Sequence, residues 1–236
     1  MLFMPNSGAR LAGIALSLLI IKAGTAMAAD LPSTKDIVAP PPFAAEDTPW
    51  FLRVGAAGLF YKASATLTLG GMPVLGGTAT ADNNVTALVE LGYFITPNVS
   101  VQFTGGYPPT ATINGAGTIS SLGTLGKVTY GPAALTASYH FNQFGPFQPY
   151  LGLGGAYAII FANHDGVVKN LNVDGNAGFV IQGGADYFIN RNWSVFVDAK
   201  HIFLQLNATG YAMGLPVTAR LTADPTIVSG GISYHW

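Results

Sequence analysis

The sequence contains no cysteine, and only 9% of its 236 residues are charged. The lack of cysteine excludes disulfides, thiolate metal sites and cysteine nucleophiles. An ordinary soluble domain carries about 25% charged residues, which form the surface that faces water. A large part of the surface of this protein is therefore expected not to face water. A net charge of −1 without any basic run gives no sign of nucleic-acid binding.

Long apolar runs are also scarce. After Ala28 no window of about 18 residues is free of glycine, proline or polar breaks, so no helix is expected to span a membrane. One short apolar run, residues 11–21, follows Arg10 and precedes the small residue Ala26. This order is typical of a secretory signal peptide, which we predict for residues 1–28. The alternative interpretation of the run is an amphipathic or buried first helix.

The remainder of the chain predicts an all-β fold. Backbone polar groups inside lipid must all be paired, and a closed β-barrel pairs them without any helix. Residues 29–49 are rich in proline, which has no backbone N–H for a sheet, and are expected to form an extended periplasmic lead-in. We predict that residues 50–236 form an eight-stranded antiparallel transmembrane β-barrel of the bacterial outer membrane. Its strands are expected at residues 50–65, 84–95, 98–110, 127–141, 147–162, 175–189, 193–209 and 219–236.

The expected strands alternate between apolar and polar residues. In the strand that begins at Trp193, the apolar Val195 and Val197 share one face, and Asp198 lies on the other. Apolar residues outside and polar residues inside are the pattern of an outer-membrane barrel. A soluble lipocalin-like barrel has the inverse pattern, with apolar residues inside and charge outside. The scarcity of charge argues against that alternative.

The connections between the expected strands alternate in length. Three of them are tight: residues 96–98, 142–146 and 190–192. The others are long: residues 66–83, 111–126, 163–174 and 210–218. In bacterial barrels the short turns are periplasmic, so an even strand number places both termini in the periplasm. Aromatic rings prefer the membrane–water interface, and those near the short turns are expected to form a periplasmic rim: Tyr93, Tyr139, Phe141, Trp193, Tyr234 and Trp236.

Polar residues on the inward faces are candidates for a network in the lumen: Arg53, Glu90, Gln102, His140, Asp186, Asp198 and Lys200. Because an unpaired buried charge is costly, the two basic residues are expected to pair with the three carboxylates. We interpret the network as a polar plug that fixes strand register and blocks ions, with contact to a solute as the alternative. Large apolar residues on inward faces either line a small pocket or fill the narrow lumen: Leu59, Leu88, Phe188 and Phe196.

Motifs of enzymes and cofactor sites are missing from the sequence. There is no G-x-S-x-G and no H-E-x-x-H motif, and the four histidines lie on different segments without metal-ligand spacing. The glycine-containing segment VDGNAG (173–178) is not a phosphate site, because no helix is expected to follow it. The sequence therefore predicts no catalytic residue, no metal and no cofactor.

Five segments, in order along the chain, resemble the OmpW family of small outer-membrane barrels. Residues 147–157, FQPYLGLGGAY, are similar to its F-x-P-Y-x-G-x-G-x-x-Y segment, and residues 184–189, GADYFI, to its G-x-D-Y-x-I unit. The other matches are the turn at Gly92–Asn98, the positions Pro132, Leu135 and Tyr139, and the closing segment from Asp224-Pro225 to Trp236. The chain departs from the family in ending on Trp where these barrels usually end on Phe, and in an unusually apolar first long loop.

The resemblance implies a narrow barrel that is associated with passage of small hydrophobic molecules across the outer membrane. It also implies three partners: outer-membrane lipid, lipopolysaccharide and the barrel-assembly machinery, which would recognise the C-terminal aromatic strand. The alternative function is a structural or surface-interaction barrel with a plugged lumen, whose loops contact host, phage or lipopolysaccharide. A continuous inward apolar path would favour the first function, and a plugged lumen the second.

Overall fold

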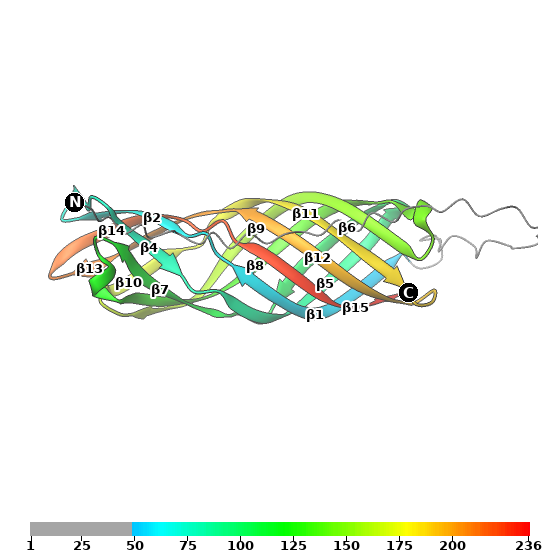
Figure 1. Ribbon diagram of the computed structural model, residues 1–236, viewed down its shortest axis with the longest axis horizontal. Helices are drawn as coiled ribbons and strands as arrows, with labels where there is room; N and C mark the ends of the chain where they lie inside the picture. Colours follow the sequence, from blue (N-terminus) through cyan, green and yellow to red (C-terminus); the bar gives the residue numbers. More distant parts are fainter. Residues whose placement is uncertain (1–48) are drawn as a thin grey trace, which may run out of the picture. The chain divides into compact units, whose positions relative to one another are not determined.

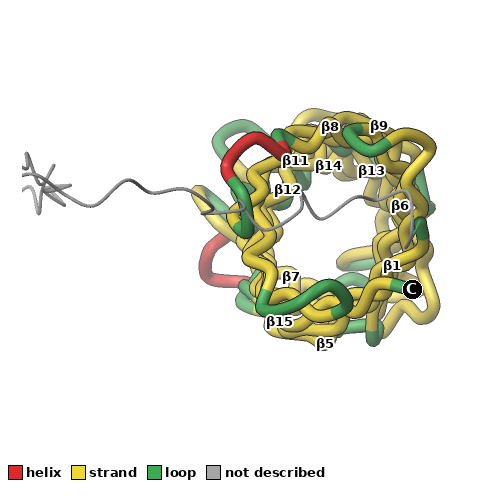
Figure 2. Tube along the Cα trace, turned by 90° about the vertical axis from the view of Figure 1, so that its right-hand side faces the viewer, coloured by secondary structure: helices red, strands yellow, loops and turns green. Residues whose placement is uncertain are grey.

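Eight long antiparallel strands close a barrel. The structure, a computed structural model, describes residues 49–236. The expected signal peptide (1–28) and, apart from Pro49, the expected lead-in lie outside the described residues. The barrel strands are β1 (Trp50–Phe60), β5 (Asn84–Thr96), β6 (Val99–Gly106), β8 (Thr124–His140), β9 (Phe147–Asp165), β11 (Ala177–Phe188), β12 (Trp193–Phe203) and β15 (Thr226–His235). They follow the order β8-β6-β5-β1-β15-β12-β11-β9, and β9 pairs with β8 (Figures 1 and 2), which confirms the predicted barrel.

The two faces of each barrel strand differ in polarity because side chains alternate along a strand. In β12, Val195 and Val197 lie on the outer face with 41% and 63% of their surface exposed, whereas Ser194 and Asp198 are buried. The antiparallel register places Val197 beside Ala185 of β11, so the outer face stays apolar from one strand to the next. This is the surface expected of a barrel in contact with lipid.

The two ends of the barrel differ in their connections. Tight turns join β5 to β6, β8 to β9 and β11 to β12, and the β8–β9 turn contains the 3-10 helix η2 (Asn142–Phe144). We call this the turn end and the opposite end the loop end. The turn end also holds the junction of the described termini, where the Trp50 N–H donates to the carbonyl of Trp236 (3.2 Å). Within residues 49–236, no helix is long and apolar enough to cross a bilayer.

The segments that were expected to be long loops are mostly strands. β4 (Gly77–Ala81) and β7 (Thr110–Gly117) extend the barrel sheet beside β8, and the 3-10 helix η1 (Ser120–Leu122) follows β7. A second, five-stranded sheet has the order β10-β13-β14-β2-β3. Its strands are β10 (Lys169–Asp174), β13 (Gln205–Ala212), β14 (Leu215–Thr222), β2 (Ser64–Leu69) and β3 (Met72–Pro73). We call these seven strands, together with the loop-end parts of β8 and β9, the extension (left in Figure 1).

Two of the expected strands, 193–209 and 219–236, contain the barrel strands β12 and β15, but their loop-end limits are wrong, because each range spans a change of sheet. The chain leaves the barrel sheet at Leu204, whose N–H donates to the Asp224 carboxylate (2.9 Å) instead of to a neighbouring barrel strand. Asp224 has a positive φ of 35°, and Pro225 after it has no N–H to donate. These features separate β14 from β15, so that the two strands belong to different sheets.

The extension has an apolar interior. One buried cluster contains Ala79, Leu125 and Val168, and a second contains Val128, Val173 and Ala208. Partly buried Ile113, Leu171 and Leu221 pack against both clusters. The apolar interior of the protein therefore continues from the barrel into the extension.

The β9–β10 hairpin in the extension is held by one carboxylate. The side chain of Asp165 accepts hydrogen bonds from the backbone N–H groups of Leu171 and Asn170, both at 3.0 Å. These bonds stabilise the ionised carboxylate and lower the pKa of Asp165 below its ordinary value. Asn170 itself has a positive φ of 49°, which is common for Asn in tight turns.

Candidate functional site

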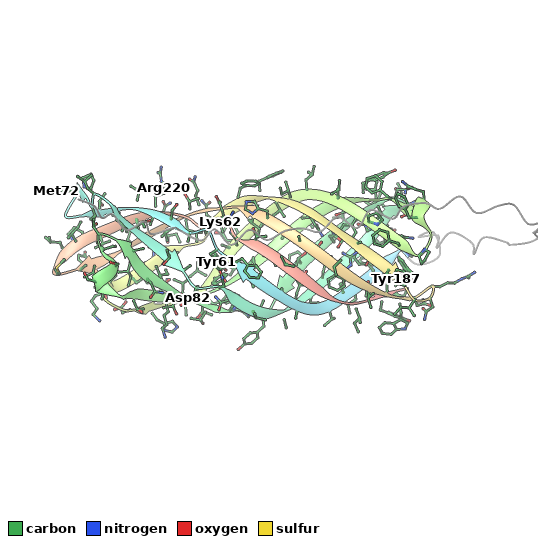
Figure 3. All side chains as sticks on the ribbon, in the orientation of Figure 1. Tyr61, Lys62, Met72, Asp82, Tyr187 and Arg220 are labelled. Carbon is green, nitrogen blue, oxygen red and sulfur yellow. The ribbon has the colours of Figure 1, made fainter. Side chains whose placement is uncertain are left out.

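The aromatic residues expected at the rim lie near the turn end: Tyr93, Tyr139, Phe141, Trp193, Tyr234 and Trp236. Their rings contact one another between strands, as in the Trp193–Tyr234 pair with a centroid distance of 4.8 Å. Sequence reasoning missed Trp50, whose ring lies 4.8 Å from that of Tyr93. Tyr187 lies at the same end (Figure 3). A belt of exposed aromatic rings is typical of a membrane–water boundary.

Five charged side chains meet inside the barrel, and we call them the ionic plug: Arg53, Glu90, Asp186, Asp198 and Lys200. The Arg53 guanidinium donates to Glu90 Oε1 (2.7 Å) and to Asp186 Oδ2 (2.5 Å). The Lys200 ammonium donates to Glu90 Oε2 (2.8 Å) and Asp198 Oδ1 (2.7 Å). All five residues are at most 4% exposed. Each cation therefore joins two carboxylates, and Glu90 links the two cations.

Tyr150 of β9 connects the plug across the lumen. Its hydroxyl accepts from the Arg53 guanidinium (3.2 Å) and donates to the Asp198 carboxylate (2.8 Å). Gly184 makes room for it, because a Cβ at that position would lie 2.5 Å from the Tyr150 hydroxyl oxygen. Sequence reasoning left out Tyr150, although the alternation that starts at Gln148 places it on the inward face.

Neutral amides extend the network. Gln182 donates to the Asp198 carboxylate (2.7 Å) and accepts from Gln102 (2.9 Å). Gln102 also donates to the hydroxyl of Ser138 (2.7 Å). Of the three neutral residues, Gln102, Ser138 and Gln182, only Gln102 belongs to the predicted set. Gln182 lies on the inward face of β11, two residues after Val180, so strand alternation was sufficient to find it.

A layer of aromatic and histidine rings lies on the turn-end side of the plug. His140, the remaining predicted lumen residue, contacts the Ser100 hydroxyl (2.9 Å) and the ring of Phe94 (centroid distance 4.8 Å). Phe188 belongs to this layer, with its ring 4.8 Å from that of His235. The structure thus separates Phe188 from the other candidates for an apolar lining. Phe188 lies at the turn end because β11 runs in that direction and Phe188 is its last residue.

The other three candidates for the apolar lining, Leu59, Leu88 and Phe196, share one buried cluster. Phe196 lies against the plug, with its ring centroid 5.3 Å from the guanidinium carbon of Arg53. Leu59 lies six residues after Arg53 on β1, toward the loop end. The cluster therefore covers the loop-end side of the plug with apolar side chains.

An apolar cavity of about 90 Å³ lies between this cluster and the extension. Its wall includes Leu59, Tyr61, Tyr130, Ile202, Leu204 and Ile227. A second cavity of about 30 Å³ lies within the extension, and the two share Ala79, Ile113 and Leu221 in their walls. Among the described residues, no group of His, Asp or Glu side chains is placed to hold a metal ion. The lumen therefore combines apolar cavities on the loop-end side with the ionic plug nearer the turn end.

Known proteins with similar sequences and folds are outer-membrane barrels. A sequence model of the OmpW family matches residues 48–236. The dibenzothiophene metabolism operon protein PahQ of Pseudomonas aeruginosa is 36% identical, over 78% of this chain and 87% of that protein. Outer membrane protein AlkL of Ectopseudomonas oleovorans is 31% identical, over 71% of this chain and 73% of that protein.

A solved structure gives the same fold. The crystal structure of the outer membrane protein OprG from Pseudomonas aeruginosa superposes with a TM-score of 0.74, at 20% sequence identity, over 80% of this chain and 96% of that chain. The closed eight-stranded ring, its apolar outer face and the sequence match over the whole described region agree with one another. The chain belongs to the OmpW family and is an outer-membrane β-barrel protein.

Proposed function

We propose that the protein lets small hydrophobic molecules pass into or across the outer membrane. The observation that carries this proposal is the apolar cavity, which shares wall residues with the cavity of the extension and so leads toward the loop end. The name of the relative PahQ refers to the metabolism of dibenzothiophene, which is an apolar aromatic molecule. We also propose that the loop end faces the outside and that both termini are periplasmic, because tight turns are periplasmic in bacterial barrels.

The plug and the exposed tips of the extension support the alternative, a surface-interaction barrel. Met72, Leu75 and Met213 are 75–85% exposed, and exposed apolar groups are available to a partner such as lipopolysaccharide. The cavity favours passage, since a purely structural barrel has no need of an apolar space above its plug. The uptake experiments below distinguish the two functions.

We propose that solutes leave the cavity sideways into lipid, because the ionic plug blocks the axial route. The barrel wall has one poorly paired stretch beside the cavity, where β8 changes its partner from β6 to β7, and we call this stretch the seam. β6 pairs with β8 only as far as Thr104 and Ala134, and β7 pairs with β8 only from Thr110 and Thr129. Between these limits, the bond from the Tyr130 N–H to the Pro109 carbonyl (3.1 Å) is the one backbone hydrogen bond found across the seam in the described part of the chain.

Proline explains why the seam is poorly paired. Pro108, Pro109 and Pro132 have no N–H to contribute to a ladder. Pro132 and Tyr130 are also in the wall of the cavity, so the weak part of the wall borders the proposed solute site. Separating strands here breaks fewer hydrogen bonds than at any fully paired stretch.

Filling the cavity is expected to abolish uptake. Ala158 is buried in the cavity wall, and the Ala158→Phe substitution places a ring in the space that the solute needs. Overpacking costs about 1–3 kcal/mol, which a barrel tolerates. The measurement is uptake of naphthalene, followed by its own fluorescence, into liposomes that contain the purified barrel.

The matched control for this experiment is Ala137→Phe, on the outer face of β8. Both variants are first checked for heat-modifiable gel mobility, which reports a folded barrel. Uptake at the wild-type rate in Ala158→Phe would show that the cavity is not on the route.

Locking the seam is expected to stop uptake reversibly. Continuing the β6–β8 register beyond Thr104 and Ala134 brings Gly105 opposite Ala133. Facing residues of a paired antiparallel ladder have Cα atoms about 4.5–5.5 Å apart, within the range of a disulfide, so a disulfide between these two positions would hold the seam in the geometry of a paired ladder. A Cβ at Gly105 meets only ordinary contacts, and the chain has no cysteine of its own to interfere. The Gly105→Cys/Ala133→Cys variant should take up solute when reduced and lose uptake when oxidised.

The control for the seam is the Val101→Cys/Ala137→Cys variant, which joins the same two strands where they are already paired. Its oxidation is expected to leave uptake unchanged. Equal uptake by the reduced and the fully oxidised seam variant would rule out this exit.

A further inference from the structure

Two tyrosines meet in the wall of the apolar cavity. Tyr61 follows β1, and Tyr130 lies on β8; β5 and β6 separate these strands in the barrel. Their hydroxyl groups are hydrogen-bonded to each other, and the rings lie edge to face with centroids 6.2 Å apart. Figure 3 shows Tyr61 at the junction between the barrel and the extension. The pair therefore spans the lumen at the level where a solute would enter the cavity.

The position of both side chains is set by their surroundings. The Tyr61 N–H donates to the Asn83 side chain (3.1 Å), and the Tyr130 N–H donates to the Pro109 carbonyl (3.1 Å). Tyr61 packs against the apolar cluster that covers the plug, whereas Tyr130 packs against this cluster and against a cluster of the extension. The two hydroxyls are therefore held at one place on the apolar route.

The Tyr61–Tyr130 pair keeps one hydroxyl proton that is available for a further hydrogen bond. Two hydroxyls carry two protons, and one hydrogen bond between them uses only one. Among the described residues, neither hydroxyl makes another hydrogen bond. The rest of the cavity wall is almost entirely apolar, with Thr80 and Tyr157 as its other side chains that bear a hydroxyl. An O–H group without an acceptor in apolar surroundings is unfavourable, and an acceptor atom on a bound molecule would satisfy it.

We propose that the Tyr61–Tyr130 hydroxyl pair binds the polar atom of the solute, so that the protein prefers apolar molecules that carry one hydrogen-bond acceptor over pure hydrocarbons of the same shape. This inference rests on the proposed passage of hydrophobic molecules and adds the chemical class that is selected. A neutral hydrogen bond contributes a modest net free energy, which corresponds to a preference of roughly two- to tenfold.

The test compares naphthalene with quinoline, which has the same shape and one ring nitrogen that accepts a hydrogen bond. Binding is measured by equilibrium dialysis against the full-length mature barrel in lipid nanodiscs, and protein-free nanodiscs correct for partition into lipid. The wild type is expected to bind quinoline about two- to tenfold more tightly than naphthalene. The Tyr61→Phe/Tyr130→Phe variant should bind both equally, with its affinity for naphthalene undiminished.

Two further variants make the test specific. Tyr61→Phe alone keeps one O–H in the cavity and should keep the preference. Tyr107→Phe removes a hydroxyl from a side chain that is 75% exposed, outside the cavity wall, and should behave as wild type. Heat-modifiable mobility shows that each variant is folded.

The outcomes separate this inference from the proposed function. Equal binding of both molecules by the wild type, or a preference that persists in the double Phe variant, would overturn the role of the pair while leaving the hydrophobic route intact. Binding of neither molecule by the folded wild type would overturn the proposed function and this inference with it.

Discussion

The Arg53→Ala variant is expected to be less stable than the wild type by about 3–5 kcal/mol, because it breaks a buried ion pair by removing one partner. Arg53 is 1% exposed and neutralises Glu90 and Asp186 at 2.7 and 2.5 Å. Without it, Asp186 keeps only a weak contact to the Ser194 hydroxyl at 3.4 Å among its side-chain partners in the described structure. A buried carboxylate left without a cation is far more costly than the lost bond itself.

The measurement is equilibrium unfolding of the refolded barrel in urea, followed by tryptophan fluorescence. Arg191→Ala is the matched control, because Arg191 is exposed in the tight β11–β12 turn and the change there should stay within about 0.5 kcal/mol. If both variants unfolded at the same urea concentration, the plug would not be a source of stability.

A charge-balanced variant provides a second comparison. Arg53→Ala/Glu90→Ala/Asp186→Ala removes the arginine together with both carboxylates, and it leaves the Lys200–Asp198 pair at 2.7 Å. Because no charge remains without a partner, the triple variant is expected to be more stable than Arg53→Ala alone, in spite of having lost three side chains.

The same triple variant is expected to conduct ions through the lumen. In the wild type, the plug fills the lumen with side chains that are at most 4% exposed, and we expect no steady current in planar bilayers. Removing three large side chains leaves a polar gap beside Tyr150 and Gln102. It also removes the guanidinium that packs on the rings of Phe51 and Phe196, at 4.8 and 5.3 Å from the ring centroids, so these rings are freed to move and let water and ions reach the gap. The measurement is single-channel recording at fixed voltage, in which the triple variant should show discrete openings.

The control for conductance removes three charges outside the lumen: Asp82→Ala/Lys169→Ala/Asp174→Ala. These residues are exposed before β5 and on β10, so this variant should stay closed. A wild-type current equal to that of the triple plug variant would mean that the plug is not the barrier to ions. Uptake of apolar solutes should continue in all of these variants, because the proposed lateral route does not pass the plug.

Strand alternation predicted which residues of the site face inward, and the cost of an unpaired buried charge predicted that the two cations meet the three carboxylates. It did not predict which cation contacts which carboxylate. Arg53 and Glu90 are direct neighbours in the β1–β5 register, so a pairing of these two strands is enough to place them together. Two other contacts are different, because Asp186 of β11 reaches Arg53, and Lys200 of β12 reaches Glu90, across the lumen. Closure of the barrel decides those contacts, and it equally decides the meeting of Tyr61 with Tyr130.

The extension was hidden from sequence reasoning for a physical reason. β2 pairs with β14, about 150 residues later in the chain, through contacts such as the hydrogen bond between the hydroxyls of Thr68 and Thr218. Segments rich in Gly have weak strand signals of their own, and only such distant pairing makes them strands. The prediction of long loops for these segments was therefore wrong. The tight turns depend on local residues, and they were placed correctly.

The sequence by itself determined the class of fold, the eight barrel strands and the inward or outward direction of their side chains, because period-two alternation and scarce charge are local properties of the chain. Only the tertiary structure decided which charges pair, where Phe188 lies, that an apolar cavity remains above the plug, and that the wall is weakly paired near Pro132. These features depend on the stagger of strands in the closed ring and on contacts between residues far apart in sequence. No local pattern encodes them.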